Sequence, residues 1–267
     1  MDPTEMLAAA RRSLMSTTER MADLIATAPD IDVQAHRCEW SLREVAAHFI
    51  TGAPMFADMA NGIPGPAERL DKAYVKDFCE RRIADVSERD PLKLSRLILD
   101  GVEGFLDTTV DRPGDDPVIF QAGLPHTLFG LVGILLGEAL LHGYDVATAL
   151  GRPWPIEVGD AALVLAAYTP LLAVWDVDAE RTRGLTADIG IELRGVAEMT
   201  ARFVDGSFGI AAAGGPVDAT LSADPVAYLM VGAGRLSRFE AVALGAMTVG
   251  GSRPDIAFEF PTFFIYP

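Results

Sequence analysis

The chain has 267 residues, of which 50% are hydrophobic and 22% are charged. This length and apolar content predict a globular protein with one large domain or two ordinary ones. The net charge of −16 at pH 7 would repel a nucleic acid or an anionic membrane surface, so neither is expected as a partner.

Helical periodicity dominates the first two thirds of the chain. Apolar residues at helical spacing predict a helix over residues 4–27. The sequence S-L-R-E is a capping box, in which Ser41 caps a helix and Glu44 bonds back to it, so a second helix is expected over residues 42–60. The remaining apolar runs predict further helices at about 67–86, 91–109, 128–150 and 159–176.

From about residue 185 the pattern changes to short segments in which apolar and polar side chains alternate. The segments D-I-G-I-E-L, A-E-M-T-A-R-F-V-D-G, S-F-G-I-A and V-D-A-T-L-S-A predict strands that are separated by glycine-containing turns. Asp224 and Pro225 then start a short helix as N-cap and first residue. We therefore predict an α+β protein with two domains, a helical bundle over residues 1–180 and a smaller α+β domain over residues 181–267.

Cysteine usage and the absence of a leader indicate the compartment. Cys38 and Cys79 form no C-x-x-C motif, so a disulfide scaffold is not expected and a reducing interior fits. The N-terminal M-D-P-T-E-M lacks the regions of a signal peptide. The apolar run Leu128–Leu141 contains Glu138 and several glycines, which favours a buried helix over a membrane span. We expect a cytoplasmic protein.

One ionisable pair stands out in the apolar run 128–150. Glu138 and His142 are four residues apart, so a helix places them on one face. A glutamate and a histidine at this spacing can both point at one cation if a facing helix supplies a third ligand. His48, within the predicted helix 42–60, is the best candidate for that ligand. Such a set suits Zn²⁺ or a similar divalent ion.

A structural role is the alternative for each residue taken alone. A histidine in an apolar helix is often a core residue that is bonded to a neighbouring carbonyl or carboxylate. Glu138 alone is equally explained by a buried ion pair or by a solvated position. Asp145 follows His142 by three residues and either orients a ligand from the second shell or lies exposed near the helix end.

Two motifs resemble those of a known family. W-S-L-R-E-V-A-A-H-F at 40–49 is similar to the first signature of the mycothiol-dependent maleylpyruvate isomerases and their relatives. E-A-L-L-H-G-Y-D-V-A at 138–147, followed by L-G-R-P at 150–153, resembles their second signature. D-A-T-L-S-A-D-P-V-A-Y-L-M-V-G-A-G-R at 218–235 is similar to a strand-helix passage of sterol carrier protein 2. The resemblance implies a DinB-like up-down bundle and a sterol-carrier-like second domain.

The resemblance also implies a chemistry. In that family the matching residues, here His48, Glu138 and His142, hold a divalent metal, usually zinc, and mycothiol is the thiol cofactor. A metal-bound thiol is deprotonated and becomes a nucleophile. It either isomerises a cis double bond and leaves, or attacks an electrophile and stays attached. Relatives are expected to use an arginine of the C-terminal domain near the thiol, for which Arg235 and Arg253 are candidates.

We therefore expect an enzyme that acts on a small electrophilic molecule with a low-molecular-weight thiol as partner, either as a monomer or as a homodimer. Asp145 and Arg235 are the candidate catalytic residues and Arg253 is a candidate cofactor contact. A non-catalytic carrier of an apolar ligand is the main alternative, because the run 159–176 is apolar and the second domain resembles sterol carrier protein 2. A regulatory protein that keeps the metal without turnover is a third.

Overall fold

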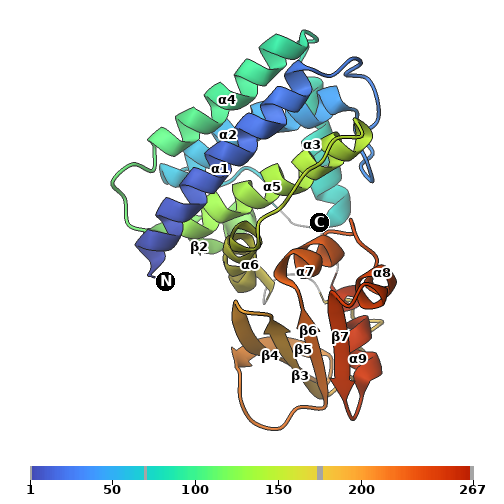
Figure 1. Cartoon of the computed structure of the whole chain (residues 1–267). Helices are drawn as coiled ribbons and strands as arrows, with labels where there is room; N and C mark the ends of the chain where they lie inside the picture. The colour runs from blue at the N-terminus through green and yellow to red at the C-terminus, as the bar shows by residue number, and fades with distance from the viewer. Residues whose placement is uncertain (1, 69–70, 173–176, 265–267) are drawn as a thin grey trace. The chain divides into compact units, whose positions relative to one another are not determined.

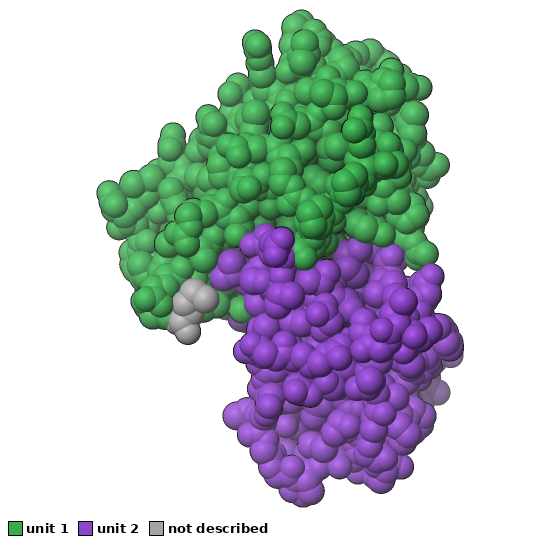
Figure 2. Space-filling model, viewed as in Figure 1, with its two compact units in different colours: residues 1–156, 166–168, 267 green, residues 157–165, 169–266 purple. Residues whose placement is uncertain are grey.

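The protein is a mixed α+β structure in a computed structural model that describes residues 2–68, 71–172 and 177–264 (Figure 1). The chain forms two compact units (Figure 2). Unit 1 comprises residues 1–156 and 166–168, and unit 2 comprises residues 157–165 and 169–266. An α+β class was predicted, and this part of the prediction is confirmed.

Unit 1 is built from long helices. They are α1 (Pro3–Ala26), α2 (Leu42–Ala60), α3 (Lys72–Ala84), α4 (Pro91–Asp107) and α5 (Leu128–Ala149). α1 packs against α4 and α5, while α2 packs against α3, α4 and α5. The predicted capping box at the start of α2 is present, since Glu44 N donates to Ser41 Oγ and Ser41 N donates to Glu44 Oε2. The cap fixes where α2 begins and hence where its later residues face.

α5 is the buried centre of unit 1. It has 22 residues and is long and apolar enough to cross a membrane, but 83% of its most apolar window is buried inside the protein. The burial of this apolar window therefore marks α5 as a core helix. Among the described residues it is the one helix that passes this test of length and composition. Of its two ionisable residues on one face, His142 is buried and Glu138 is half-buried.

A small hairpin precedes α5 and was not predicted. β1 (Pro117–Ile119) pairs antiparallel with β2 (Pro125–Thr127) around the short 3-10 helix η1 (Gln121–Gly123). Thr127 ends β2 and caps α5 by accepting from Gly130 N. The hairpin thus sets the start of the helix that carries Glu138 and His142.

Unit 2 contains a five-stranded sheet in the order β5-β4-β3-β6-β7. β3 and β6 are parallel and the other neighbours are antiparallel. The strands are β3 (Ala187–Leu193), β4 (Ala197–Val204), β5 (Ser207–Ala212), β6 (Ala219–Ala223) and β7 (Met247–Gly251). The helices are α7 (Pro225–Gly232), α8 (Arg238–Ala243), α9 (Pro254–Glu259) and the 3-10 helix η2 (Phe260–Phe263). The strands predicted from alternation are present, and the predicted helix after Asp224 is α7.

The apolar interior of unit 2 is aromatic. Phe203, Phe208, Phe260, Phe263 and Phe264 make ring contacts with one another at centroid distances from 4.9 to 6.4 Å. These rings join the inward side chains of β3 and β6 in one core. The described residues thus give unit 2 a packed core of its own.

α6 (Val158–Leu172) is shared between the units. Most of the helix belongs to unit 2, whereas residues 166–168 group with unit 1. The sequence places the whole helix in a domain that ends at residue 180, and that domain boundary stays a prediction. Residues 173–176, the end of the predicted helix 159–176, lie outside the described residues.

Candidate metal centre

The structure brings together the three predicted ligands. His48 comes from the second turn of α2, and Glu138 and His142 come from successive turns of α5. His48 Nε2 lies 3.3 Å from Glu138 Oε2, and His142 Nε2 lies 3.4 Å from the same oxygen. One ligand atom from each residue falls in a group whose members are all within 4.8 Å of one another.

These separations fit an ion better than a plain ion pair. Zinc bonds of about 2.0–2.1 Å in a regular tetrahedron place two ligand atoms about 3.3–3.4 Å apart. A charge-assisted hydrogen bond between imidazolium and carboxylate is shorter, at about 2.7–2.9 Å. The two distances therefore match two edges of a coordination tetrahedron. Three such ligands leave a fourth position for an exogenous molecule.

Electrostatics at this group favour a cation. Burial alone would raise the pKa of the Glu138 carboxyl, but His142 and His48 hold it well below its usual range. Burial lowers the pKa of His142, yet Asp145 and Glu138 together raise it to about 9. The carboxylates of Glu138 and Asp145 thus interact with the imidazoles of His48 and His142. A divalent ion would displace the imidazole protons and balance both negative charges.

Asp145 lies behind His142. Its side chain is fully buried and its Oδ2 lies 3.4 Å from His142 Nδ1. The alternative that it lies exposed is wrong, because α5 turns it inward. His142 Nε2 faces Glu138, and Nδ1, the nitrogen nearest to Asp145, is buried without a hydrogen-bond partner among the described residues. A second group, Cys38 with His142 and Asp145, overlaps the first through His142.

Aromatic rings enclose the two histidines. The Trp40 ring lies 4.9 Å from that of His48 and 5.7 Å from that of His142, tilted by 35° and 31°. Phe49 meets both imidazoles edge-on, at 5.9 and 6.2 Å. The structure thus places Trp40 over the predicted ligands. Rings in these positions cover part of the group, whose His48 and Glu138 side chains keep exposed fractions of 21% and 31%.

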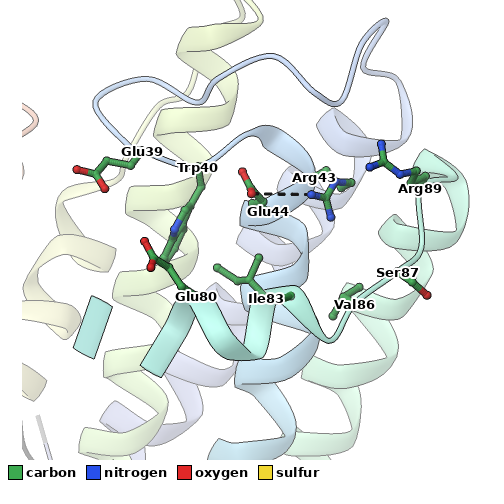
Figure 3. Close-up of a pocket in the computed structure, with 10 residues that line it drawn as sticks. Glu39, Trp40, Arg43, Glu44, Glu80, Ile83, Val86, Ser87 and Arg89 are labelled. Atoms are coloured by element: carbon green, nitrogen blue, oxygen red, sulfur yellow. Dashed lines mark ion pairs between the residues drawn. The ribbon is translucent and has the colours of Figure 1, made fainter. Parts of the chain in front are cut away.

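Trp40 also lines a cavity of about 570 Å³ (Figure 3). Glu80 of α3 lies beside the indole in this view, and Arg43 forms an ion pair with Glu44. Glu39 and Arg89 add a further charge of each sign to the lining. The cavity therefore offers hydrogen-bond donors and acceptors next to the ring that covers the histidines.

Two residues that sequence reasoning missed interact electrostatically with the ligands. Burial, together with the Glu138 carboxylate, raises the pKa of the Tyr168 phenol of α6 well above the usual value. Burial lowers the pKa of His48, but Cys79 of α3 and Glu138 together raise it above its usual value. Tyr168 has a signal in the sequence, since its hydroxyl interrupts an apolar run as Glu138 does. Cys79 has none that we can identify.

The remaining candidates lie apart from this group. Arg235 and Arg253 belong to unit 2, where Arg235 Nη1 donates to Ala233 O at 2.7 Å and Arg253 Nη1 donates to Thr186 O at 3.0 Å. Their predicted roles near a thiol stay predictions.

Comparison with solved structures reveals the fold. The chain is similar to the crystal structure of a mycothiol-dependent maleylpyruvate isomerase, with a TM-score of 0.55 and 17% identity, over 89% of this chain and 91% of that chain. A histidine-to-alanine mutant of the mycothiol-dependent maleylpyruvate isomerase gives the same TM-score at 16% identity, over 94% of this chain and 93% of that chain. The chain has the maleylpyruvate isomerase fold. No family profile matches the sequence, and no curated protein matches it.

The likeness extends over both units of this chain, because about nine tenths of each of the two compared chains are covered. The resemblance seen in the motifs is thereby confirmed at the level of the fold. At 16–17% identity the likeness carries no reaction with it. The chemistry has to be argued from the site.

Proposed function

We propose that this protein is a metal-dependent enzyme in which His48, Glu138 and His142 hold a divalent ion, with zinc as the expected metal. A low-molecular-weight thiol, mycothiol by resemblance, would serve as cofactor for an isomerase or S-transferase acting on a small electrophile. The supporting observation is the spacing of 3.3 and 3.4 Å between one carboxylate oxygen and two imidazole nitrogens. A bound divalent ion would lower the pKa of a thiol and supply a thiolate at neutral pH.

The protein's own residues prepare this chemistry. Asp145, whose Oδ2 lies 3.4 Å from His142 Nδ1, would favour the tautomer in which Nδ1 carries the proton and Nε2 is free to coordinate. Trp40 and Phe49 cover the imidazoles, and the exclusion of water strengthens electrostatic interactions with a charged thiol. Arg235 and Arg253 remain our candidates for contacts with the thiol or the substrate, on the strength of the resemblance alone.

Metal content is the direct test. Protein purified without a polyhistidine tag should contain about one zinc per chain, measured by mass spectrometry of the metal, and His48→Ala should contain almost none. His36→Ala is the matched control, because His36 packs on Tyr144 outside the ligand group. Wild-type protein that binds no stoichiometric divalent ion, and is unchanged by His48→Ala, would contradict the proposal.

Activity separates the enzyme from its alternatives. The metal-loaded protein should accelerate conjugation or isomerisation of a panel of small electrophiles by mycothiol, and His48→Ala should abolish the acceleration. A lipid that co-purifies in a stoichiometric amount, with no turnover of the panel, would favour the carrier. Zinc binding without turnover of any electrophile would favour a regulatory protein.

A further inference from the structure

The far side of the His142 ring carries a second group of possible ligands. Cys38 Sγ, one nitrogen of His142 and one oxygen of Asp145 all lie within 4.8 Å of one another. His142 Nε2 faces Glu138, whereas Nδ1 lies 3.4 Å from Asp145 Oδ2, so Nδ1 is the nitrogen on this side. We call Cys38, His142 and Asp145 the outer group, and His48, Glu138 and His142 the inner group.

The outer group contains a buried nitrogen that lacks a hydrogen bond. His142 is 9% exposed, and its Nδ1 has no hydrogen-bond partner among the described residues. Buried polar atoms are normally satisfied, so an unsatisfied one calls for an explanation. Zinc bonds of about 2.0–2.1 Å place two ligand atoms about 3.3–3.4 Å apart. The 3.4 Å between Nδ1 and Asp145 Oδ2 therefore suits two ligands of one ion.

The loop before α2 places the sulfur beside these two atoms. His36 N donates to Asp145 O at 3.1 Å and ties the loop to α5, and Gln34 Nε2 donates to Cys38 O at 3.0 Å. Cys38 is half-buried and lines a surface cavity of about 520 Å³ that the loop shares with Ala149 of α5. An ion can therefore reach the outer group from solvent through this cavity.

We propose that Cys38, His142 and Asp145 form a second metal site, which takes a thiophilic divalent ion from solution. Thiolate, imidazole and carboxylate together suit Zn²⁺ and ions of similar preference. Binding displaces the thiol proton of Cys38 and any proton on His142 Nδ1. Since Nε2 stays on the inner side, the outer site fills whether or not the inner group holds an ion.

The outer site is expected to bind more weakly than the inner one. Cys38 lies in a loop at a cavity, whereas all three ligands of the inner group lie on helices. A ligand on a loop is held less precisely than one on a helix. We therefore expect the outer site to fill from added ions and not to retain zinc through purification.

The test adds Co²⁺ to reduced, metal-free His48→Ala, in which the inner group is incomplete. One ion per chain should bind and give the near-ultraviolet charge-transfer band of a thiolate–cobalt bond. Adding Cys38→Ser should abolish this band, and adding Asp145→Asn should weaken cobalt binding by about 100-fold or more. Adding Cys79→Ser is the matched control and should keep the band, because Cys79 belongs to neither ligand group among the described residues.

The outcomes separate this site from the proposed function. Absence of a thiolate band in His48→Ala, a band that survives Cys38→Ser, or an affinity unchanged by Asp145→Asn would overturn the second site. The single variant Cys38→Ser leaves the inner group intact and should retain about one zinc per chain through purification. If neither it nor wild type retains zinc, while His48→Ala still gives the thiolate band, the proposed function fails and the second site stands.

Discussion

At the scale of single residues, placing the ligand group within the fold has a free-energy cost. Removing charged groups from water costs several kcal/mol unless they are paired with good geometry. Here the nitrogen–oxygen distances are 3.3 and 3.4 Å, longer than a strong ion pair needs. Coordination of an ion at the centre of the group would offset this free-energy cost. The wide nitrogen–oxygen spacing is therefore our reason for assigning this group a metal.

The outer carboxylate offers a test of that assignment. Asp145→Asn keeps the size of the side chain and removes its charge, so His142 loses the carboxylate that faces its Nδ1. We expect zinc affinity to fall by about 10–100-fold, measured by chelator competition. Asp58→Asn, an exposed position on the same helix as His48, should leave affinity unchanged. Equal affinity of both variants would argue that Asp145 is only a structural residue.

Much of the ligand group could be predicted at this scale. Spacing placed Glu138 and His142 on one face, and the motif at 40–49 supplied His48. Tyr168 could have been found by the same logic, as a polar group within an apolar run. Cys79 could not, because α3 has one buried residue, Ile83, and so little amphipathic pattern to show which face turns inward. Its position depends on tertiary packing.

At the scale of elements, α5 is packed so closely that some of its glycines cannot be replaced. A Cβ on Gly143 would lie 2.0 Å from Cζ2 of Trp154. The indole cannot move freely, because its Nε1 donates to Leu140 O and Arg20 lies over its ring at 4.1 Å. Gly143 therefore provides the space in which the chain after α5 folds back beside the metal helix.

Gly143→Ala should destabilise the protein by about 1–3 kcal/mol through overpacking. The measurement is urea-induced unfolding followed by tryptophan fluorescence, to which Trp40 and Trp154 of unit 1 contribute. Gly104→Ala is the control in an exposed part of α4, where a Cβ meets nothing within 4 Å. That variant should be neutral or up to about 1 kcal/mol more stable, from helix propensity. An unchanged free energy of unfolding in Gly143→Ala would show that the Trp154 ring can move to make room for the added methyl group.

The β1–β2 hairpin carries a titratable group in the core. Burial lowers the pKa of His126 below 6.5, despite a hydrogen bond to the Ala167 backbone. The unfolded chain therefore binds a proton at His126 more readily than the folded chain, and stability is lost as the pH falls below about 6.5. Above that pH both states are neutral at this residue, and it adds no pH dependence.

The prediction compares wild type with His126→Gln, both stripped of metal so that the ligand histidines contribute equally. Between pH 7 and 5 the unfolding free energy of wild type should fall more steeply, by at most about 1.4 kcal/mol per pH unit. Urea unfolding at a series of pH values measures the two slopes. Parallel slopes would mean that His126 titrates alike in the folded and unfolded chains.

The start of a helix could be predicted where its N-cap residues could be recognised in the sequence. α2 begins at Leu42 as the capping box required. α3 begins at Lys72 and not near 67, because Asp71 accepts from Tyr74 N and forms the N-cap. The hairpin strands have three residues each and begin with proline, so neither periodicity nor propensity could reveal them. Short elements of this kind are specified by tertiary contacts.

At the scale of the whole molecule, the two units have separate cores and separate chemistry. The ligand group and Asp145 belong to unit 1, whereas the packed phenylalanines belong to unit 2. The change of pattern near residue 185 predicted the strands of unit 2, whereas the domain boundary at residue 180 stays a prediction. The division of α6 between the two units could not be predicted, because its apolar sequence suits either core.

This separation predicts where metal binding is felt. Zinc at about 100 times its dissociation constant would stabilise the binding state by about 2.7 kcal/mol. Hydrogen exchange measured by mass spectrometry on the full chain should therefore slow in peptides of α2 and α5 when zinc replaces chelator. Peptides of β3 and β6, which contain no ligand candidate, should exchange at unchanged rates. His48→Ala should remove the zinc-dependent protection of α2 and α5 and leave the two strands as they were. Protection that appears equally in both units would mean that the metal stabilises the chain as a single cooperative body.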